Sequence, residues 1–302
     1  MGRYLTSTDF IIFEVRDAVA RITLNRPERR NALSRELLME LHAALTEADA
    51  LTDVNVILLD GAGKDFCAGY DLAASYAGRA AEGNPAPGRN EPSYRSLIGT
   101  VDDDCWNLEY SQRFTLAMFD LHKPVIAKVH GNCLAGGTDI ALGCDIVIAA
   151  EDARIGFPAT RANGNPPNHW WYYHVGPQWA KRMLFTGDVI LGKDAAKIGL
   201  VLDWAPTDRL EEEAYALARR IALVDAELLS TYKRVVNFAM EMQGAKTLQR
   251  FSAELDARAH FTNGPRRTQF KADMATGTLK QALTNRDGPF GDSVIRANWF
   301  KD

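Results

Sequence analysis

Two glycine-containing turns carry the residue types that can stabilise a developing negative charge. They are residues 64–72 (KDFCAGYDL) and residues 130–145 (HGNCLAGGTDIALGCD), and each follows an apolar segment expected to be a strand. Small residues let a ligand approach the backbone, and the free N–H groups at a helix N-terminus attract negative charge. If the two turns lie together, they offer two N–H donors to one oxygen. Such an oxyanion hole lowers a reaction barrier by about 2.7–4 kcal/mol per donor.

Asp139 is the candidate acid or base beside the second turn. It falls in the first turn of a short helix that follows Ala135, Gly136 and Gly137. An acid at that position is often there only because the helix dipole favours it. Next to the glycine turn we favour proton transfer, for which a carboxyl group with a pKa near the working pH is suited.

Several other kinds of site are excluded by the absence of their motifs. The sequence contains no GxGxxG, GxxxxGK[ST] or GxSxG pattern, which argues against a dinucleotide site, a P-loop and a serine-hydrolase elbow. The four cysteines form no CxxC pair, and the histidines are too dispersed for a zinc site. Cys67 and Cys133, which flank the two turns, are interpreted as small apolar fillers. We therefore expect no bound metal.

The elements that must hold these turns alternate between strands and helices. Apolar runs predict strands over five segments, and the first two are expected to form a hairpin that turns at Arg16 and Asp17. Ser34 is a candidate N-cap for a helix with leucines at helical spacing. The five predicted strands are residues 10–15, 19–24, 54–59, 125–129 and 146–149; amphipathic helices are predicted over residues 210–223, 227–242 and 247–260.

This pattern divides the chain into a sheet-containing part, residues 1–205, and a helical part, residues 206–302. An inserted loop is predicted over residues 73–105, since residues 77–92 (AGRAAEGNPAPGRNEP) show no apolar period. A loop of that length is either a lid over a site or a solvent-exposed insertion. In the helical part, residues 265–271 (PRRTQFK) are interpreted as a solvated basic face, with contact to a phosphate as the alternative.

Composition narrows the class of protein. The 302 residues are 46% hydrophobic and 25% charged, with a formal net charge of -4, which is typical of a globular domain. That charge argues against broad binding to nucleic acid or to an anionic membrane. The sequence shows neither an apolar run near the ~18 residues of a membrane span nor the pattern of a secretory signal. We expect a cytoplasmic protein with reduced cysteines.

Four segments, taken together and in this order, resemble the enoyl-CoA hydratase/isomerase (crotonase) superfamily. They are ITLNRPERRNALS, VILLDGAGKDFCAGYDL, KPVIAKVHGNCLAGGTDIALGCDIVIA and LFTGDVILGKDAAKIGLV. The resemblance covers residues 10–205 well and the helical tail loosely. Residues 286–292 (RDGPFGD) are further similar to actinobacterial members that carry the general name enoyl-CoA hydratase.

The resemblance implies a fold, a substrate and an assembly. The fold is an α/β spiral of β-β-α units with a C-terminal helical trimerisation region. The substrate is an acyl-CoA, as in fatty acid metabolism, and no cofactor is implied because coenzyme A is part of the substrate. The implied assembly is a homo-oligomer, either a trimer or a dimer of trimers.

The resemblance also implies roles for individual residues. The backbone N–H groups of Tyr70 and Gly136 match the two donors of the family's oxyanion hole, which hold the thioester oxygen as it becomes an enolate. In the tail, Phe261 and Arg286 are matches for residues that reach CoA, sometimes from a neighbouring subunit. Residues matching positions that line the CoA moiety come from the first loop and the two turns: Arg29 or Arg30, Ala68, Gly69, Asp71, Leu72 and Gly137.

The sequence departs from the family at the second catalytic acid. Hydratases of the family use two glutamates, whereas here the first position is Asp139 and the second is Ala159. No Asp or Glu occurs from residue 153 to residue 187, and the aromatic stretch 164–174 (GNPPNHWWYYH) stands there instead. The tryptophans and tyrosines of this stretch either line an acyl pocket or belong to the core.

Three functions remain open. The first is an enoyl-CoA isomerase in which Asp139 alone moves a proton between carbons, or an enoyl-CoA hydratase in which His169 or a bound water replaces the missing acid. The second is a CoA-thioester or C–C bond hydrolase, in which His169 or Asn163 positions the attacking water. The third is a non-catalytic relative that binds acyl-CoA. His169 itself is either catalytic or simply a packed histidine.

Overall fold

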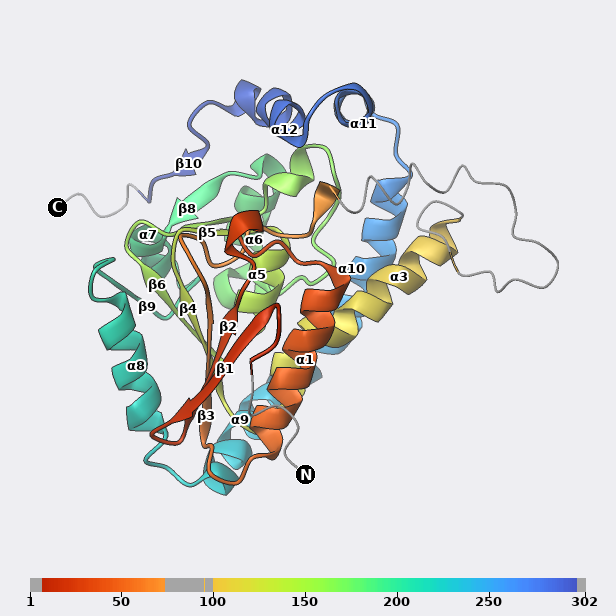
Figure 1. Cartoon of the computed structure of the whole chain (residues 1–302). Helices are drawn as coiled ribbons and strands as arrows, with labels where there is room; N and C mark the ends of the chain where they lie inside the picture. Colours follow the sequence, from red (N-terminus) through yellow and green to blue (C-terminus); the bar gives the residue numbers. More distant parts are fainter. Residues whose placement is uncertain (1–6, 74–94, 96–99, 298–302) are drawn as a thin grey trace.

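A six-stranded sheet forms the centre of the fold (Figure 1). The structure is a computed structural model that describes residues 7–73, 95 and 100–297. The strands are parallel except for the first pair, and most of their side chains are buried. In sheet order they are β1 (Ile11–Arg16), β2 (Val19–Leu24), β3 (Val56–Gly61), β4 (Val125–Val129), β6 (Ile146–Ala150) and β9 (Asp203–Ala205). The five predicted strands are confirmed, with boundaries shifted by no more than two residues.

The hairpin of β1 and β2 has a turn one residue later than predicted. Asp17 and Ala18 form the two-residue connection, with φ angles of 54° and 58°, where Arg16 and Asp17 were expected. Two positive φ angles match the twist of the flanking strands, which is why such turns are preferred in tight hairpins. Arg16 instead pairs with Val19 as the last residue of β1.

A second sheet has four short strands, and it carries the second glycine turn. Its order is β10 (Val294–Ile295), β8 (Val189–Leu191), β7 (Arg154–Gly156) and β5 (Asn132–Leu134). β5 leads directly into α5 (Gly136–Ala141), the short helix that was predicted to hold Asp139. A β-bridge between Cys67 and Cys133 joins the first turn to this sheet.

Helices cover both sides of the central sheet. α1 (Arg35–Ala50) begins at Ser34, whose side chain accepts a hydrogen bond from Leu37 N at 3.2 Å, as the N-cap prediction requires. α1 packs on β1 and β2, whereas α8 (Leu210–Ile221) packs on β3, β4 and β6. Figure 1 shows the two helices on opposite sides of the sheet.

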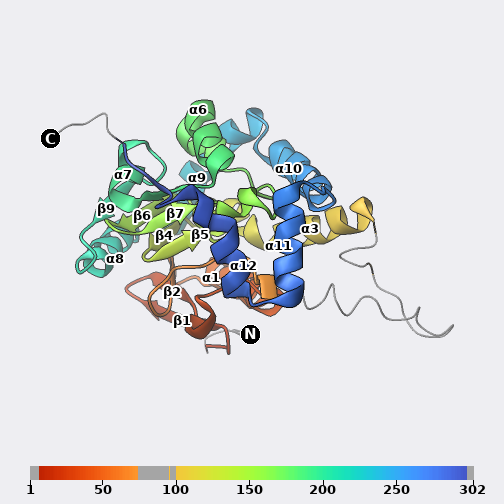
Figure 2. The ribbon, with the colours of Figure 1, turned by 90° about the horizontal axis from the view of Figure 1, so that it is seen from above.

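The C-terminal region is helical, as expected. α9 (Ala226–Met242) and α10 (Ala245–His260) confirm two of the predicted helices, and α10 packs on α3 (Val101–Thr115). Two further helices, α11 (Pro265–Thr276) and α12 (Leu279–Asp287), pack against each other. Viewed from above, they run across the molecule near the small sheet (Figure 2). The remaining elements are η1 (Pro27–Arg29), α4 (Ala117–Asp120), η2 (Pro158–Arg161), α6 (Trp171–Thr186), α7 (Gly192–Lys197) and η3 (Gly288–Phe290).

The predicted insertion ends earlier than residue 105. α3 already begins at Val101, because Thr100 caps the helix by accepting a hydrogen bond from Asp103 N at 3.0 Å. Three aspartates follow in the first turn, where the helix dipole favours negative charge. Residues 74–94 and 96–99, which contain the predicted lid or solvent loop, lie outside the described residues.

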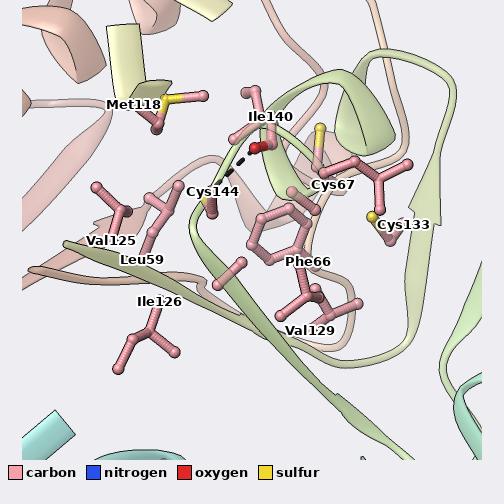
Figure 3. Close-up of a cluster of buried hydrophobic side chains, with 14 of the residues drawn as sticks. Leu59, Phe66, Cys67, Met118, Val125, Ile126, Val129, Cys133, Ile140 and Cys144 are labelled. Atoms are coloured by element: carbon pink, nitrogen blue, oxygen red, sulfur yellow. Dashed lines mark hydrogen bonds between the residues drawn. The ribbon is translucent and has the colours of Figure 1, made fainter. Parts of the chain in front are cut away.

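Residues from both glycine turns enter the main hydrophobic core (Figure 3). Cys67 and Cys133 are fully buried in it, which confirms the prediction that they fill apolar space. Burial raises the pKa of the Cys67 thiol to about 12, so this thiol remains protonated and unreactive at neutral pH. None of the described helices is both long and apolar enough to cross a membrane.

Asn31 braces the loop that leads into the first turn. Its side chain is fully buried, and Nδ2 lies within 3.1 Å of the carbonyl oxygens of Ala62, Asp65 and Phe66. Its Oδ1 accepts a hydrogen bond from Arg26 N at 2.9 Å. A single amide therefore joins the first loop to the segment between β3 and the turn.

We expect Asn31→Ala to lower the free energy of unfolding by about 2–3 kcal/mol, because buried backbone groups lose their partner. Chemical denaturation followed by circular dichroism measures this change. Asn263→Ala, at an exposed position, is the matched control and should change the value by less than about 0.5 kcal/mol. Equal stability of the two variants would show that Asn31 does not brace the loop.

Candidate active site

The structure brings the two glycine turns together. Leu134 N donates a hydrogen bond to the Cys67 carbonyl at 3.0 Å, which aligns the turns side by side. A Cβ atom on Gly69 would lie 2.9 Å from Ala135 Cβ, and one on Gly137 would lie 2.6 Å from the Cys67 carbonyl oxygen. Only glycine allows this approach, because real Cβ atoms do not come so close to their neighbours.

Two backbone N–H groups remain without an acceptor where the turns meet. Leu33 N donates to the Gly69 carbonyl at 2.8 Å and Asp71 N donates to the Leu33 carbonyl at 3.1 Å, so the bridge at Leu33 does not use Tyr70 N. Gly136 is the first residue of α5, where helices leave their N–H groups unpaired. Within the part of the chain that the structure describes, neither Tyr70 N nor Gly136 N has a hydrogen-bond acceptor.

The backbone at this junction is strained. Ala135, directly before Gly136, has φ 48° and ψ −118°, a conformation that a residue with a side chain rarely adopts. Its N–H donates to the Gly156 carbonyl at 3.0 Å, which ties the turn to β7. Strain of this kind persists only where the surrounding structure imposes it, and it is concentrated at functional sites.

Asp139 lies on the first turn of α5 with 1% of its surface exposed. Its Oδ2 accepts a hydrogen bond from the Tyr70 hydroxyl at 2.9 Å, and its Oδ1 has no partner among the described residues. Burial raises the pKa of Asp139 well above the ordinary range, and the hydrogen bond from Tyr70 only partly opposes this. Burial therefore favours the protonated form of Asp139, so this group can deliver a proton.

The Tyr70 hydroxyl is a part of the site that the sequence did not reveal. We predicted a role for the backbone N–H of Tyr70, whereas its ring also packs on Gly136 and its hydroxyl contacts Asp139. A Cβ atom on Gly136 would lie 2.9 Å from Tyr70 Cε2. A large aromatic residue directly after Ala68 and Gly69 was the only sign in the sequence that this side chain has a role. The sequence could not show its partner, because Asp139 lies 69 residues further along the chain.

His169 is held through its backbone in the part of the chain that the structure describes. Its backbone N–H donates to Gln249 Oε1, and no hydrogen bond among the described residues joins it to Asp139 or Tyr70. Its buried Nδ1 lacks a partner within the described chain, and burial lowers the pKa of the imidazole. His169 is thus a neutral side chain at neutral pH.

The aromatic stretch contributes mainly to packing. Trp170 and Trp171 are buried in the main core, and Trp170 stacks on Phe119 with ring centres 5.1 Å apart. Tyr173 is half-buried and donates its hydroxyl hydrogen bond to the Gln243 carbonyl, while Tyr172 is exposed. These positions favour the core interpretation for the two tryptophans over a pocket for an acyl chain.

The predicted CoA-lining residues of the first half gather around the first turn. Ala68 N donates to the Arg30 carbonyl at 2.9 Å, which places the exposed Arg29 and Arg30 next to the turn. The carboxylate of Asp71 accepts a hydrogen bond from Arg26 at 2.7 Å. Leu72 packs against a small apolar cluster formed by Ala162, which directly follows η2, and by Phe270 and Ala282 of the tail helices.

The predicted tail residues occupy different environments. Phe261 is exposed at the end of α10, whereas Arg286 is buried on α12 and donates to Asn163 Oδ1 at 2.7 Å. The expectation of a solvated basic face over residues 265–271 is wrong for Arg267. Arg267 is buried and donates to the His260 carbonyl at 2.7 Å, because the start of α11 folds back on the end of α10.

Asp256 is a further buried acid that the sequence did not single out. It lies on α10 with 4% of its surface exposed, and its negative charge raises the pKa of Asp139. Gln249, Ser252 and Asp256 occupy the buried face of α10 together with alanines. Polar residues at helical spacing on an apolar stripe were the available signal. Within residues 7–73 and 100–297, no group of three or more His, Cys, Asp or Glu side chains is arranged to hold a metal ion.

Comparison with known proteins points to one family. The chain matches the family model described as enoyl-CoA hydratase/isomerase over residues 14–99 and 95–267. It is similar to the solved structure of an enoyl-CoA hydratase from Mycobacterium smegmatis, with 38% identity, a TM-score of 0.84, and coverage of 94% of this chain and 95% of that one.

Two further proteins agree with this match. The structure of an enoyl-CoA hydratase/isomerase from Xanthobacter autotrophicus Py2 is 33% identical, with a TM-score of 0.83 and coverage of 94% of this chain and 99% of that one. The 2,3-dehydroadipyl-CoA hydratase of Escherichia coli is 30% identical over 235 residues, which are 77% of this chain and 83% of that protein. The two solved structures share the α/β fold predicted from the sequence.

We expect Asp139→Asn to stabilise the protein above pH 4. In the wild type, burial raises the pKa of Asp139 in the folded state, so ionisation of this group at higher pH favours the unfolded chain. The folded protein binds the Asp139 proton more tightly than the unfolded chain does. Wild-type stability is therefore complete below the ordinary pKa of 3.8 and is lost as pH rises toward the folded pKa. The amide has no such loss.

Thermal unfolding at pH 4, 6 and 8 measures this effect. The Tm of Asp139→Asn minus the Tm of the wild type should be near zero at pH 4 and should grow with pH. Asp208→Asn, at an exposed position, is the control and should give no such trend. A difference that shrinks as pH rises would contradict the buried, protonated state of Asp139.

Proposed function

The chain belongs to the enoyl-CoA hydratase/isomerase family, and we propose that it moves a proton on an enoyl-CoA thioester with Asp139 as acid and base. One observation carries this proposal. The buried carboxyl group of Asp139 lies next to the junction where Tyr70 N and Gly136 N have no acceptor within the described chain. An acid and two N–H donors are what proton transfer next to a thioester carbonyl requires.

The two N–H groups would form the oxyanion hole. A proton on the carbon next to a thioester carbonyl is too weakly acidic to leave unless the enolate oxygen is stabilised. Tyr70 N and Gly136 N come from two turns that pack directly on each other, so their geometry is set before substrate binds. This preorganisation supports stabilisation of the enolate without rearrangement of the backbone.

Asp139 would supply the proton, and Tyr70 would assist it. Burial raises the pKa of Asp139 and so favours its protonated form, which suits an acid that protonates the α-carbon of the enolate. After Asp139 gives up its proton, the Tyr70 hydroxyl at 2.9 Å would stabilise the carboxylate. Hydration and double-bond isomerisation both pass through this enolate and both use this proton transfer.

The CoA moiety would lie along the first turn. The exposed Arg29 and Arg30 next to Ala68 would attract the phosphates of CoA, and Phe261 is available on the surface of the tail. Arg286 would act on CoA only through its contact with Asn163, because its side chain is buried. The reaction needs no cofactor besides the CoA of the substrate.

The exposed face of α9 supports a homo-oligomer. Large apolar side chains line this face at helical spacing, and all of them are exposed to solvent in the single chain. A stripe of this kind is buried in a subunit interface more often than it faces water. A trimer, alone or paired with a second trimer, would cover it. The residues are Leu228, Tyr232, Val235, Val236, Phe238 and Met242.

Asp139→Asn should lower turnover of enoyl-CoA by at least about 10²-fold, since the amide cannot exchange a proton. Mass spectrometry of a panel of enoyl-CoAs incubated in heavy water reads the reaction directly. Water gain shows hydration, and deuterium uptake without water gain shows isomerisation. Asp208→Asn serves as the control and should behave as the wild type.

The same measurement separates the two alternative functions. Free CoA released together with the acid would replace this proposal with a hydrolase. Unchanged substrates, together with thermal stabilisation of the protein by CoA thioesters, would replace it with a non-catalytic acyl-CoA-binding protein. An Asp139→Asn variant as active as the wild type would remove Asp139 from the reaction.

We expect the double variant Val235→Glu and Phe238→Glu to dissociate the oligomer, because buried like charges oppose association. Light scattering coupled to size-exclusion chromatography should show a mass that falls to the 33.4 kDa of one chain. Leu202→Glu places the same charge at an exposed apolar position outside α9 and should leave the mass unchanged. A wild type of 33.4 kDa would contradict the proposed assembly.

A further inference from the structure

A hollow of about 480 Å³ opens between the residues that follow η2 and the start of α11. Asn163 and Gly164 line one side of it, and Gly264, Pro265 and Arg266 line the other. Among the described residues, its lining contains no Asp or Glu and shares no residue with the junction of the two glycine turns. The hollow is therefore separate from the candidate active site, and its volume is in the range that holds a small ligand.

α11 presents its N-terminus to this hollow without a side-chain cap. Gly264 occupies the N-cap position and has no side chain to accept a hydrogen bond from the first turn. The first turn of a helix leaves N–H groups without partners inside the helix, and the helix dipole adds partial positive charge there. Within the described chain, the Arg266 N–H has no other acceptor. An end of this kind attracts anions.

The side chain of Asn163 supplies an independent hydrogen-bond donor. Asn163 is 9% exposed, and its Oδ1 accepts a hydrogen bond from the Arg286 guanidinium at 2.7 Å. The positive partner identifies this atom as the amide oxygen, so the other end of the amide is the nitrogen. Nδ2 has no acceptor in the part of the chain that the structure describes, and Asn163 lines the hollow. A nearly buried amide nitrogen without a partner favours a ligand that brings an acceptor to it.

Arg266 adds a positive charge to the wall. Its guanidinium group lies 5.0 Å from the centre of the Phe290 ring, and it forms no ion pair with another described residue. Arg161 contacts the same ring at 4.0 Å, but its charge is already paired with Asp188 and Asp287. Of these two arginines, Arg266 is the one whose charge remains available to a ligand. Its contact with Phe290 restricts where the guanidinium lies.

The carboxylates that approach the hollow are held by other groups. Asp256 Oδ1 accepts a hydrogen bond from the Asn165 backbone N–H at 2.7 Å. Asp287 accepts hydrogen bonds from Arg161 and Arg286. Neither carboxylate lines the hollow, so the charged side chains on its wall are arginines only.

We propose that this hollow binds the phosphate group of a small molecule other than the acyl-CoA substrate. A phosphate has enough oxygens to meet three separate donors, which are the Arg266 guanidinium, the first turn of α11 and Asn163 Nδ2. A carboxylate, with two oxygens and one charge, leaves one of these donors without an acceptor. None of the residues assigned to the CoA moiety lines the hollow, so this site is independent of the reaction at Asp139.

Calorimetric titration of the full chain with inorganic phosphate, at constant ionic strength, tests the site. We expect saturable binding, and we expect the affinity to fall by about tenfold or more in Arg266→Gln, which removes the charge-assisted hydrogen bonds. Arg250→Gln, at an exposed position on α10 outside the hollow, is the matched control and should keep the wild-type affinity.

Two substitutions at Gly264 test the helix N-terminus without loosening the fold. A Cβ atom at this position meets nothing within 4 Å, and the backbone, with φ −60° and ψ 154°, already has the extended conformation of an N-cap residue. Gly264→Asp supplies a carboxylate that caps the first turn and repels an anion, so phosphate binding should be lost while the Tm stays the same or rises. Gly264→Ala adds similar backbone restriction but no acceptor, and it should bind phosphate as the wild type does.

Enzyme kinetics separate this site from the proposed function. In phosphate-free buffer, Arg266→Gln and Gly264→Asp should keep the wild-type kcat and KM for enoyl-CoA, and CoA should not displace bound phosphate. A wild type that binds no phosphate, or a Gly264→Asp variant that binds it as well as the wild type, would overturn this site and leave the role of Asp139 intact. Displacement of phosphate by CoA, with a raised KM in Arg266→Gln, would overturn it by assigning Arg266 to the substrate. A wild type that turns over no enoyl-CoA but binds phosphate through Arg266 would support this site and overturn only the proposed function.

Discussion

The burial of one carboxyl group beside unpaired backbone N–H groups is the constraint on which the rest of this structure depends. An uncharged Asp139 tolerates the core, and its Tyr70 partner provides a hydrogen bond when the group ionises. The fold does not relax this arrangement, because glycines at 69 and 137 leave the turns in direct contact. The strained backbone at Ala135 shows that the geometry is imposed from outside the turn.

The parallel sheet explains how two distant segments reach this geometry. β3 and β4 are neighbours, and the segments that follow them emerge at the same edge of the sheet. The bridge between Cys67 and Cys133 then holds these segments together inside the core, and Asn31 fastens the first loop to them. The two turns are thus continuous with the strands of the sheets. The same contacts that stabilise the core also position the turns.

The C-terminal helix α10 packs with α3 around the segment that follows Ala159. α10 and α3 hold the segment after Ala159 through amide and carboxylate contacts, and these contacts bring Asp256 into the electrostatic range of Asp139. The adjacent α9 exposes large apolar side chains. The C-terminal helices therefore hold the segment after Ala159 through buried polar contacts.

The sequence by itself determined the strands, the helix that starts at Ser34 and the two glycine turns, because apolar periodicity, caps and glycine act locally. It also singled out Asp139 as a candidate acid, because this residue follows the second glycine turn. Only the tertiary structure showed the hydroxyl of Tyr70, the burial of Arg267 and the approach of Asp256 to the Ala159 turn. Each is a contact between residues far apart along the chain, and neither composition nor spacing specifies which buried polar groups meet. Burial itself, which sets the protonation of both acids, is likewise a property of the packed molecule.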